Sequence, residues 1–195
     1  MEKFKLKNYL DYNFNQKDFT ETKNTDIEFE NCTFNNCNIT NIDFMNCRFL
    51  NCQFKTSDLS LITLNNCFIK DLTFDSCKLM GIKWMEAKNS NLLANLNFIN
   101  SILNYSSFID MHLQNTVFLD CTCKEVDFSD ANLKNATFKG SDLAGTIFKN
   151  TNLENANFQN SKNYRISIYN NKIKQAKFTM PEAMSLFDEF NIQII

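Results

Sequence analysis

The side chains best suited to chemistry in this sequence are eight cysteines and one histidine, His112. Cysteines repeatedly lie five residues apart, from Cys32 to Cys37 and from Cys47 to Cys52. A C-x2-C pair, a frequent spacing of zinc ligands, does not occur. A disulfide framework is typical of small secreted chains, and the N-terminal segment lacks the apolar run of a signal peptide. We therefore expect reduced thiols and no metal site.

His112 is the one candidate for a catalytic base of the Ser-His-Asp or Cys-His type, because the chain has no second histidine. It immediately precedes Leu113, an apolar position of the repeat described below, so we expect its imidazole to face solvent. The chain also lacks the G-x-G-x-x-G, G-x4-G-K-[ST] and H-E-x-x-H motifs of nucleotide and metal sites. These observations predict a protein that is not an enzyme and holds no cofactor.

Composition and charge exclude several classes of protein. The 195 residues include 20 Phe but only 3 Gly and 1 Pro, so tight hairpins are few or are built without those residues. A formal net charge of −2 is neither the basic field of a nucleic-acid-binding protein nor a strongly acidic one. No segment approaches the ~18 apolar residues of a membrane span. We expect a cytoplasmic protein that binds neither nucleic acid nor membranes directly.

A period of five residues runs through most of the chain. Stepping by five from Phe14 leads to Trp84 through mostly apolar residues, and after a shift of one residue the pattern resumes at Leu93 and continues to Phe178. Sixteen of the 20 Phe lie on these positions. Chance would place only about a fifth of them in any one frame, so the period is an internal repeat.

A second series of positions lies two residues before each of these. It holds small or medium side chains and includes most of the cysteines. Because free Cys packs as a small buried hydrophobic residue, this series explains the five-residue cysteine spacing as core packing. Metal binding and redox chemistry are the less favoured alternatives.

A period of five fits neither a strand, which alternates by two, nor an amphipathic helix, which repeats by 3.6 residues. The segments Ala131–Asn135, Ser141–Gly145 and Ala156–Asn160 resemble the A-[DN]-[LF]-x-x motif of the pentapeptide-repeat family. The resemblance covers residues 14–178. It implies an all-β fold, a right-handed quadrilateral β-helix with four pentapeptides in each coil.

Four pentapeptides make a coil of 20 residues, so residues 20 apart should stack at the ~4.8 Å spacing of neighbouring strands. Phe98, Phe118 and Phe138 then form one column, while Leu113 and Leu133 belong to another. The sequence therefore predicts Phe columns on two opposite sides of the coil and mainly Leu columns on the other two.

The repeat divides the chain into five parts. Residues 1–13 are expected to be an N-terminal lead-in or cap, and residues 14–84 the first β-helical segment. The frame shift at residues 85–92 is a four-residue insertion or a one-residue deletion, which we expect to form a small loop, bulge or bend, with Trp84 filling the core beside it. Residues 93–178 form the second segment and residues 179–195 a C-terminal helix and tail.

The C-terminal part has the sequence of a cap. Thr179-Met180-Pro181-Glu182 fits a capping box with Pro in the first turn, and a short α-helix to about Phe190 is expected, followed by a strand-like tail. This end is more apolar than one coil end requires. We expect this end either to cap the last coil only, or to cap it and also form a two-fold dimer interface. The residues expected in this interface are Met180, Ala183, Met184, Phe187, Phe190, Ile192 and Ile194.

A continuous solenoid closed by an apolar helix also resembles the Qnr- and MfpA-type quinolone-resistance proteins. That resemblance implies a rod-shaped dimer that imitates duplex DNA and binds DNA gyrase and topoisomerase IV. The candidate partner-binding row is Asp110, Asp127 and Asp130, which the 20-residue repeat places on one side. Rows of carboxylates can occupy a basic groove shaped for phosphates.

Two features depart from that pattern. The net charge is small, and lysines interrupt the acidic positions of the same region. The projecting loops of the larger Qnr proteins have no counterpart beyond residues 85–92. The alternative is therefore an interaction scaffold for another cytosolic protein. The interrupting lysines are Lys124, Lys134, Lys139 and Lys149.

Overall fold

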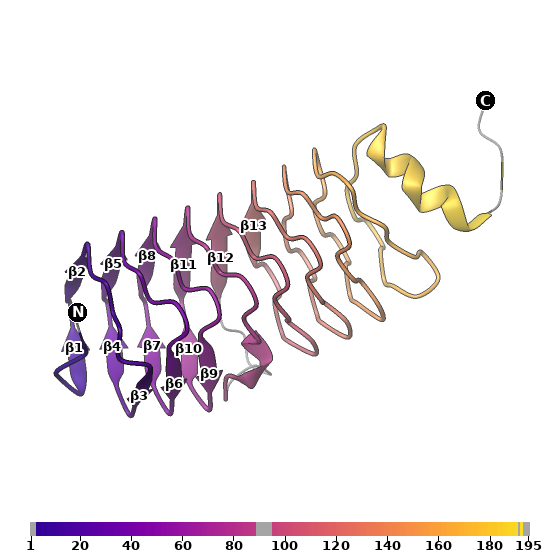
Figure 1. Ribbon diagram of the computed structural model, residues 1–195. Coiled ribbons are helices and arrows are strands. Elements are labelled where there is room, and N and C mark those ends of the chain that lie inside the picture. Colours follow the sequence, from indigo (N-terminus) through magenta and orange to yellow (C-terminus); the bar gives the residue numbers. More distant parts are fainter. Residues whose placement is uncertain (1–2, 89–94, 191, 193–195) are drawn as a thin grey trace.

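The computed structural model describes residues 3–88, 95–190 and 192, and in it the chain winds into a right-handed four-sided β-helix (Figure 1). Every strand pairs in parallel with the strand one coil away. The pairing joins Asn8 to Glu28 and Thr33 to Gln53, so one coil is 20 residues as the sequence predicts. The predicted fold is confirmed.

The four sides of the coil, called faces A to D in chain order, are built as follows. Face A contains β1 (Asn8–Leu10), β4 (Glu28–Glu30), β7 (Arg48–Leu50) and β10 (Phe68–Lys70). Face B contains β2 (Asn13–Asn15), β5 (Thr33–Asn35), β8 (Gln53–Lys55), β11 (Leu72–Asp75), β12 (Leu96–Ile99) and β13 (Val117–Leu119). Face C is a series of single-residue bridges from Asp18 to Lys162. Face D contains β3 (Lys23–Thr25), β6 (Asp43–Met45) and β9 (Thr63–Asn65).

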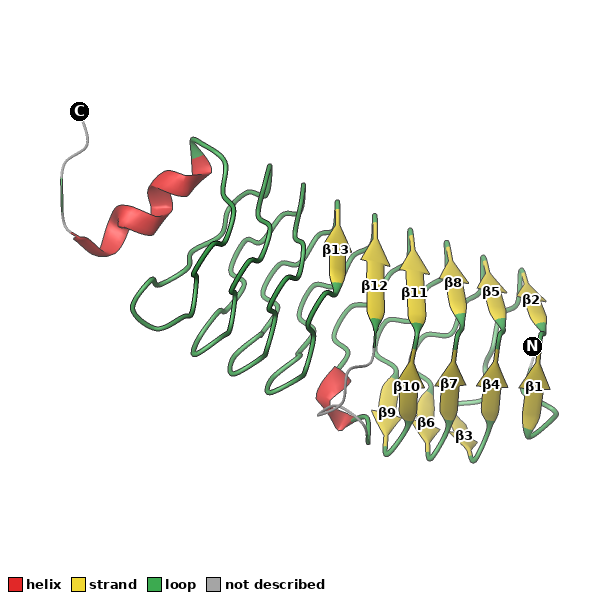
Figure 2. Cartoon of the chain, turned by 180° about the vertical axis from the view of Figure 1, so that it is seen from behind, coloured by secondary structure: helices red, strands yellow, loops and turns green. Residues whose placement is uncertain are grey.

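Beyond β13 the faces continue as single-residue parallel bridges, which the cartoon draws as loops with the same spacing (Figure 2). Most of the three-residue strands bury their central side chain and turn the two flanking ones outward. The residue two positions before the centre is also buried, as at Cys32 and Cys52. Each pentapeptide thus supplies two side chains to the core and three to the surface.

The corners between faces explain the scarcity of glycine. One residue at each regular corner has a positive φ, and most of these residues are Asn or Asp, which tolerate the left-handed region. Their side chains also bond from coil to coil: the Asn51 amide donates to Asn31 Oδ1 (2.8 Å), and Asn31 donates to Asp11 Oδ1 (3.0 Å). Leu61 and Tyr105 occupy the same kind of position with exposed apolar side chains.

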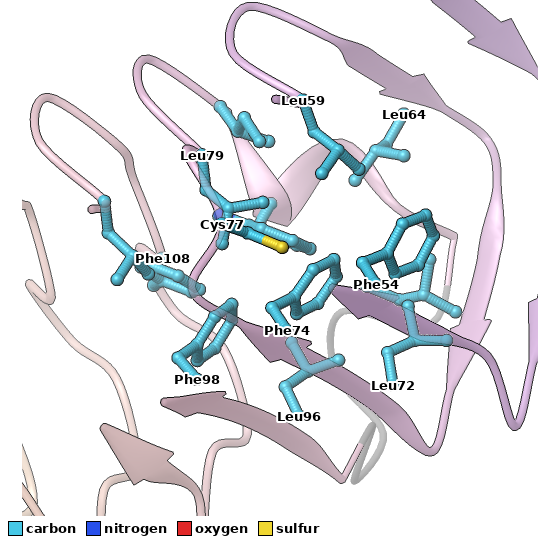
Figure 3. Packing of buried hydrophobic residues seen from close by; sticks show 14 of the residues in the cluster. Phe54, Leu59, Leu64, Leu72, Phe74, Cys77, Leu79, Leu96, Phe98 and Phe108 are labelled. Carbon is cyan, nitrogen blue, oxygen red and sulfur yellow. The ribbon is translucent and has the colours of Figure 1, made fainter. Parts of the chain in front are cut away.

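Face B carries one uninterrupted column of aromatic rings from Phe14 to Phe178. Consecutive rings are stacked with centroids 4.6–5.2 Å apart. Phe54, Phe74 and Phe98 are three successive members of it (Figure 3). Rings from the opposite face D meet this column edge-on, for example Phe128 against Phe118 at 5.4 Å. The predicted Phe columns on two opposite sides are confirmed in the second segment, whereas in the first segment Phe29 and Phe49 lie on face A, next to face B.

The interruption is a four-residue insertion. Phe74 of β11 pairs in register with Phe98 of β12, a step of 24 residues instead of 20. The coil continues to Lys88, whose backbone N–H donates to Cys67 O at 2.8 Å. Residues 89–94, including the predicted restart at Leu93, lie outside the described residues.

Trp84 fills the core beside this insertion. It begins the short 3₁₀-helix η1 (Trp84–Glu86) and is 1% exposed. Its ring stacks on Phe108 one coil later at 5.6 Å and meets Phe74 and Phe98 edge-on. The continuous aromatic column of face D therefore begins at Trp84 and runs across the break to Phe148.

All eight cysteines are free and buried, as core packing predicts. At the corner between faces B and C, thiols and hydroxyls alternate from coil to coil. Ser101 accepts a hydrogen bond from the Cys77 backbone N–H (3.0 Å) and donates to Ile99 O (2.8 Å). This column satisfies backbone groups inside the corner. Its members are Cys37, Ser57, Cys77, Ser101, Cys121, Ser141 and Ser161.

The β-helix begins earlier than predicted. Residues 8–10, expected in the lead-in, form β1, and Tyr9 stacks on Phe29 at 5.3 Å. Lys7 and Tyr12 are too large for the small inner positions, but at the end of the rod both remain exposed. Phe4 turns inward and closes the core by stacking on Phe19 at 4.2 Å.

The repeat frame also breaks in the last coils. The period predicts that Asn163 points inward, but it is exposed, with its amide donating to Asp142 Oδ1 at 2.7 Å. Tyr164 and Ile166 are buried instead. Because Asn163 finds a polar partner outside, the apolar side chains that follow fill the core.

The C-terminal helix differs from the predicted type. It is a 3₁₀-helix, η2 (Glu182–Phe190), with no buried residue. The predicted capping box does not form, because the Thr179 hydroxyl accepts a hydrogen bond from the Asn160 backbone N–H of the preceding coil (2.7 Å). The helix crosses beyond the last coil at an angle (Figure 1).

Candidate binding surface

The surface consists of columns of polar side chains repeated at the coil spacing. Opposite charges one coil apart form ion pairs, such as Arg48 with Glu28 at 3.0 Å and Lys134 with Glu154 at 3.3 Å. Exposed pairs of this kind each contribute about 0–1 kcal/mol. Recognition must therefore depend on how charges and apolar groups are distributed among the faces.

The predicted acidic row lies on one side of the rod. Asp127 is a bridge residue of face D, between Ser107 and Ile147. Asp110 and Asp130 lie one coil apart at the corner between faces D and A, both exposed and both with positive φ. The Asp130 carboxylate accepts a hydrogen bond from Asn150, the next residue of that column (3.2 Å).

Further carboxylates share this side and were missed in the sequence. Counting face D with its two corners, eight carboxylates face four cationic side chains, Lys23, Lys83, Lys149 and Arg165. The 20-residue repeat would have placed the carboxylates of both segments on one side, but only with the insertion counted as four residues. The eight are Glu21, Asp26, Asp43, Glu86, Asp110, Glu125, Asp127 and Asp130.

The four lysines that interrupt the acidic positions in sequence are distributed over all four faces. Lys124 follows Thr122 on face C and pairs with Asp142 at 3.7 Å. Lys134 lies on face A and Lys139 on face B, next to bridge residues of those faces. Only Lys149 shares face D with the acidic row. The structure therefore separates charges that are mixed in the sequence.

His112 is exposed on face A, where it bridges to Asn132 of the next coil. Its outward position agrees with the prediction. Within residues 3–88 and 95–190, no group of three His, Cys, Asp or Glu side chains could hold a metal ion. No helix of the described chain is long and apolar enough to cross a membrane.

The C-terminal end exposes a second, apolar surface. Met180, Phe187, Phe190 and Ile192 are exposed, Ala183 and Met184 are half-buried, and Ile194 lies outside the described residues. Helix η2 contacts the preceding segment through Phe190 and Tyr169, with ring centroids 6.0 Å apart. Leu186 of η2 packs against the core, but Ile173 and Phe178 of the last coil remain only partly buried, so η2 closes the core incompletely.

A groove of about 410 Å³ separates η2 from the end of face D. It is lined by Ile147, Phe148 and Ile166 together with charged and hydroxyl side chains of both walls. Ser167 bridges the walls by donating to Glu189 Oε2 at 3.1 Å. The apolar end surface thus adjoins the last part of face D, where Arg165 lines the groove.

These features define a repeat protein that presents flat, regularly spaced surfaces. The chain matches the family described as pentapeptide repeat region over residues 27–93 and 88–158, and it belongs to that family. No curated protein matches it.

Solved structures of the same fold resemble this chain. A trypsin-treated variant of QnrB1, a plasmid-mediated fluoroquinolone resistance protein, is 17% identical with a TM-score of 0.65, covering 96% of this chain and 100% of that one. Full-length QnrB1 is 16% identical with a TM-score of 0.56 over 95% and 100%. HetL of the cyanobacterium Nostoc, involved in heterocyst differentiation regulation, is 13% identical with a TM-score of 0.50 over 87% and 84%. At these identities the likeness concerns the fold.

Proposed function

We propose that this chain is a non-catalytic cytoplasmic protein that places its acidic face D in the DNA-binding groove of a type II topoisomerase, DNA gyrase or topoisomerase IV, and protects that enzyme from quinolones. The observation that carries the proposal is the eight-to-four excess of carboxylates over Lys and Arg side chains on one side of the rod. A groove that binds DNA is lined with Lys and Arg that neutralise phosphates. A row of carboxylates offers the same groove an alternative set of anions.

Charge spacing sets the strength expected of this contact. Neighbouring carboxylates of one column, such as Asp110 and Asp130, are one coil apart, about 4.8 Å. Duplex DNA carries one charge per ~1.7 Å of its axis. The rod therefore has a lower charge density than DNA, and we expect binding in the micromolar range that weakens with added salt.

Replacement of the acidic row tests the proposed partner. In Asp110→Asn/Asp127→Asn/Asp130→Asn, loss of three charges should raise the concentration needed to inhibit gyrase supercoiling about tenfold or more, as expected for three interfacial charges. The matched control carries the same change of charge on other parts of the rod, Asp71→Asn/Asp75→Asn/Asp120→Asn, and should behave as wild type. If wild-type protein neither inhibits gyrase nor relieves quinolone poisoning at micromolar concentration, the topoisomerase is not its partner.

A second candidate function is an interaction scaffold for another cytosolic protein. The observation in its favour is the pair of exposed apolar side chains at left-handed corners, Leu61 (55% exposed) and Tyr105 (68%). Asn or Asp occupies most such corners at a lower conformational cost. Inactivity toward topoisomerases, combined with loss of a cellular interaction in Leu61→Asn/Tyr105→Asn, would favour the scaffold.

We also propose that two copies join through the C-terminal surface by a two-fold axis. The exposed Phe187, Phe190 and Met180 and the half-open last coil support this contact. Phe187→Asp/Phe190→Asp should convert a dimer to a monomer in sedimentation velocity with unchanged circular dichroism. Leu10→Asp, at an exposed apolar residue of the opposite end, is the control and should remain dimeric. A monomeric wild-type mass at high concentration would exclude the dimer.

A further inference from the structure

Two pairs of buried cysteines are stacked on consecutive coils. Cys32 and Cys52 lie at the corner between faces A and B, and Cys47 and Cys67 at the corner between faces D and A. Backbone hydrogen bonds join each pair of coils at these points, from Gln53 N to Cys32 O (2.9 Å) and from Phe68 N to Cys47 O (2.8 Å). In-register neighbours are about 4.8 Å apart, within the Cα separation of ~4.4–6.8 Å that a disulfide requires.

The side chains of each pair are neighbours in the corner, and each thiol donates hydrogen bonds to backbone carbonyls. Cys32 donates to Tyr9 O and Glu30 O (3.4 Å each), and Cys52 donates to Phe29 O (3.5 Å) and Leu50 O (3.3 Å). The neighbouring thiol lowers the pKa of Cys32 to about 7, despite burial, and it raises the pKa of Cys52 together with burial. Cys47 and Cys67 repeat this arrangement, with the pKa of Cys47 lowered to about 7 beside Cys67. Cys32 and Cys47 are thus the more acidic thiols of the two pairs.

We propose that each stacked pair is an oxidisable site that hydrogen peroxide converts into a disulfide between consecutive coils. The thiolate of Cys32 attacks one peroxide oxygen, the O–O bond breaks, and a sulfenic acid and hydroxide form. The Cys52 sulfur then attacks the sulfenic sulfur, the S–S bond forms, and the sulfenic hydroxyl leaves as water with the Cys52 proton. Two thiols are oxidised and one peroxide is reduced to two waters. Cys47 and Cys67 react in the same way.

The remaining four cysteines are an internal comparison for this chemistry. Cys37, Cys77 and Cys121 belong to the column in which a serine separates successive thiols. Burial raises the pKa of Cys77 and of Cys121 to about 12. Cys123 stacks in the Leu column of face C, one coil from Leu103 and Leu143. None of the four has a cysteine one coil away in its own column, so they should stay reduced.

Both disulfides would join the same two coils. Cys32 and Cys47 belong to the coil of residues 28–47, and Cys52 and Cys67 to the coil of residues 48–67. The cross-links therefore connect these coils at both edges of face A. A link that closes a chain loop restricts the unfolded state and so stabilises the folded one. This inference concerns the coils themselves and does not depend on the partner proposed above.

The test is peroxide treatment of the folded full-length protein, followed by alkylation of remaining thiols in denaturant and peptide mapping without reduction. We expect four of the eight thiols to be lost, with the linkages Cys32–Cys52 and Cys47–Cys67. The thermal midpoint should rise by about 5 °C or more and fall again on reduction. Linkages involving Cys37, Cys77, Cys121 or Cys123, or retention of all eight thiols in the folded protein, would overturn the proposal.

Two variants separate the pairs from the other thiols. Cys52→Ser/Cys67→Ser should form neither disulfide and should trap sulfenic acid at Cys32 and Cys47, detectable with a dimedone probe. Serine already alternates with cysteine in the neighbouring corner, so this variant is expected to fold. The matched control Cys77→Ser should form both disulfides as wild type does. A midpoint shift of equal size in the double variant would show that the stabilisation has another origin.

Discussion

Phe118→Ala is expected to lower the free energy of unfolding by about 3–5 kcal/mol, as for a fully buried Phe in a packed core. Phe118 is 0% exposed and stacks between Phe98 (5.1 Å, 12°) and Phe138 (4.8 Å, 0°). It also meets Phe108 and Phe128 of face D edge-on. The truncation to Ala removes both the stacking and the edge contacts. Each coil packs only against its two neighbouring coils, so few other contacts can compensate for the lost stability.

Urea denaturation followed by circular dichroism measures this loss. Leu119→Ala is the matched control, because Leu119 belongs to the same strand, β13, but faces outward and is half-buried. We expect it to cost less than about 1 kcal/mol. Phe178→Ala, at the half-open end of the same column, should cost less than Phe118→Ala. Equal losses at Phe118 and Phe178 would contradict the stacked-column account.

Deletion of residues 120–124 is expected to destabilise the protein by about 2–4 kcal/mol more than deletion of residues 120–129, although it removes half as many residues. Both deletions join Leu119 to a corner residue of positive φ, Glu125 or Asp130, so the backbone turn is retained. The five-residue deletion rotates the following chain by one face, so that at the junction Phe128 stacks on Leu103 and Phe138 on Leu113. The ten-residue deletion rotates it by two faces, so Phe again meets Phe.

A third deletion completes the comparison. Removal of residues 120–139 joins Leu119 to Gly140, also a positive-φ corner, and takes out one full coil. It restores every column and should unfold cooperatively in urea with a smaller m-value, because less surface is exposed. If the five-residue deletion were the most stable of the three, the separation of Phe and Leu columns would not contribute to specificity.

Much of the fold follows from the period because each pentapeptide repeats the same backbone unit. The residues at inner positions and the 20-residue coil are confirmed from Phe14 to Phe158, and the alternation of Phe and Leu faces is confirmed in the second segment. The predictions are wrong where the backbone departs from the repeating pentapeptide. Asn163 lies outside the core because Asp142 offers its amide a hydrogen bond there, and Thr179 caps no helix because Asn160 engages its hydroxyl.

The candidate site was predicted less completely for a geometric reason. A frame shift of one residue in a period of five is the same for a four-residue insertion and a one-residue deletion. Only the pairing of Phe74 with Phe98 distinguishes the two. With that pairing known, Asp26 and Asp43 join Asp130 on one side of the rod. The structure likewise assigns most of the interrupting lysines to other faces.

The sequence by itself determined the coil length, the inner positions from Phe14 to Phe158 and the burial of the cysteines, because these depend only on steps within one repeating unit. Only the tertiary structure decided which columns continue across the insertion, which charges share a face, and that Cys32 meets Cys52 while a serine separates Cys37 from Cys77. Those relations depend on the register between consecutive coils, which coil-to-coil hydrogen bonds and ring stacking determine.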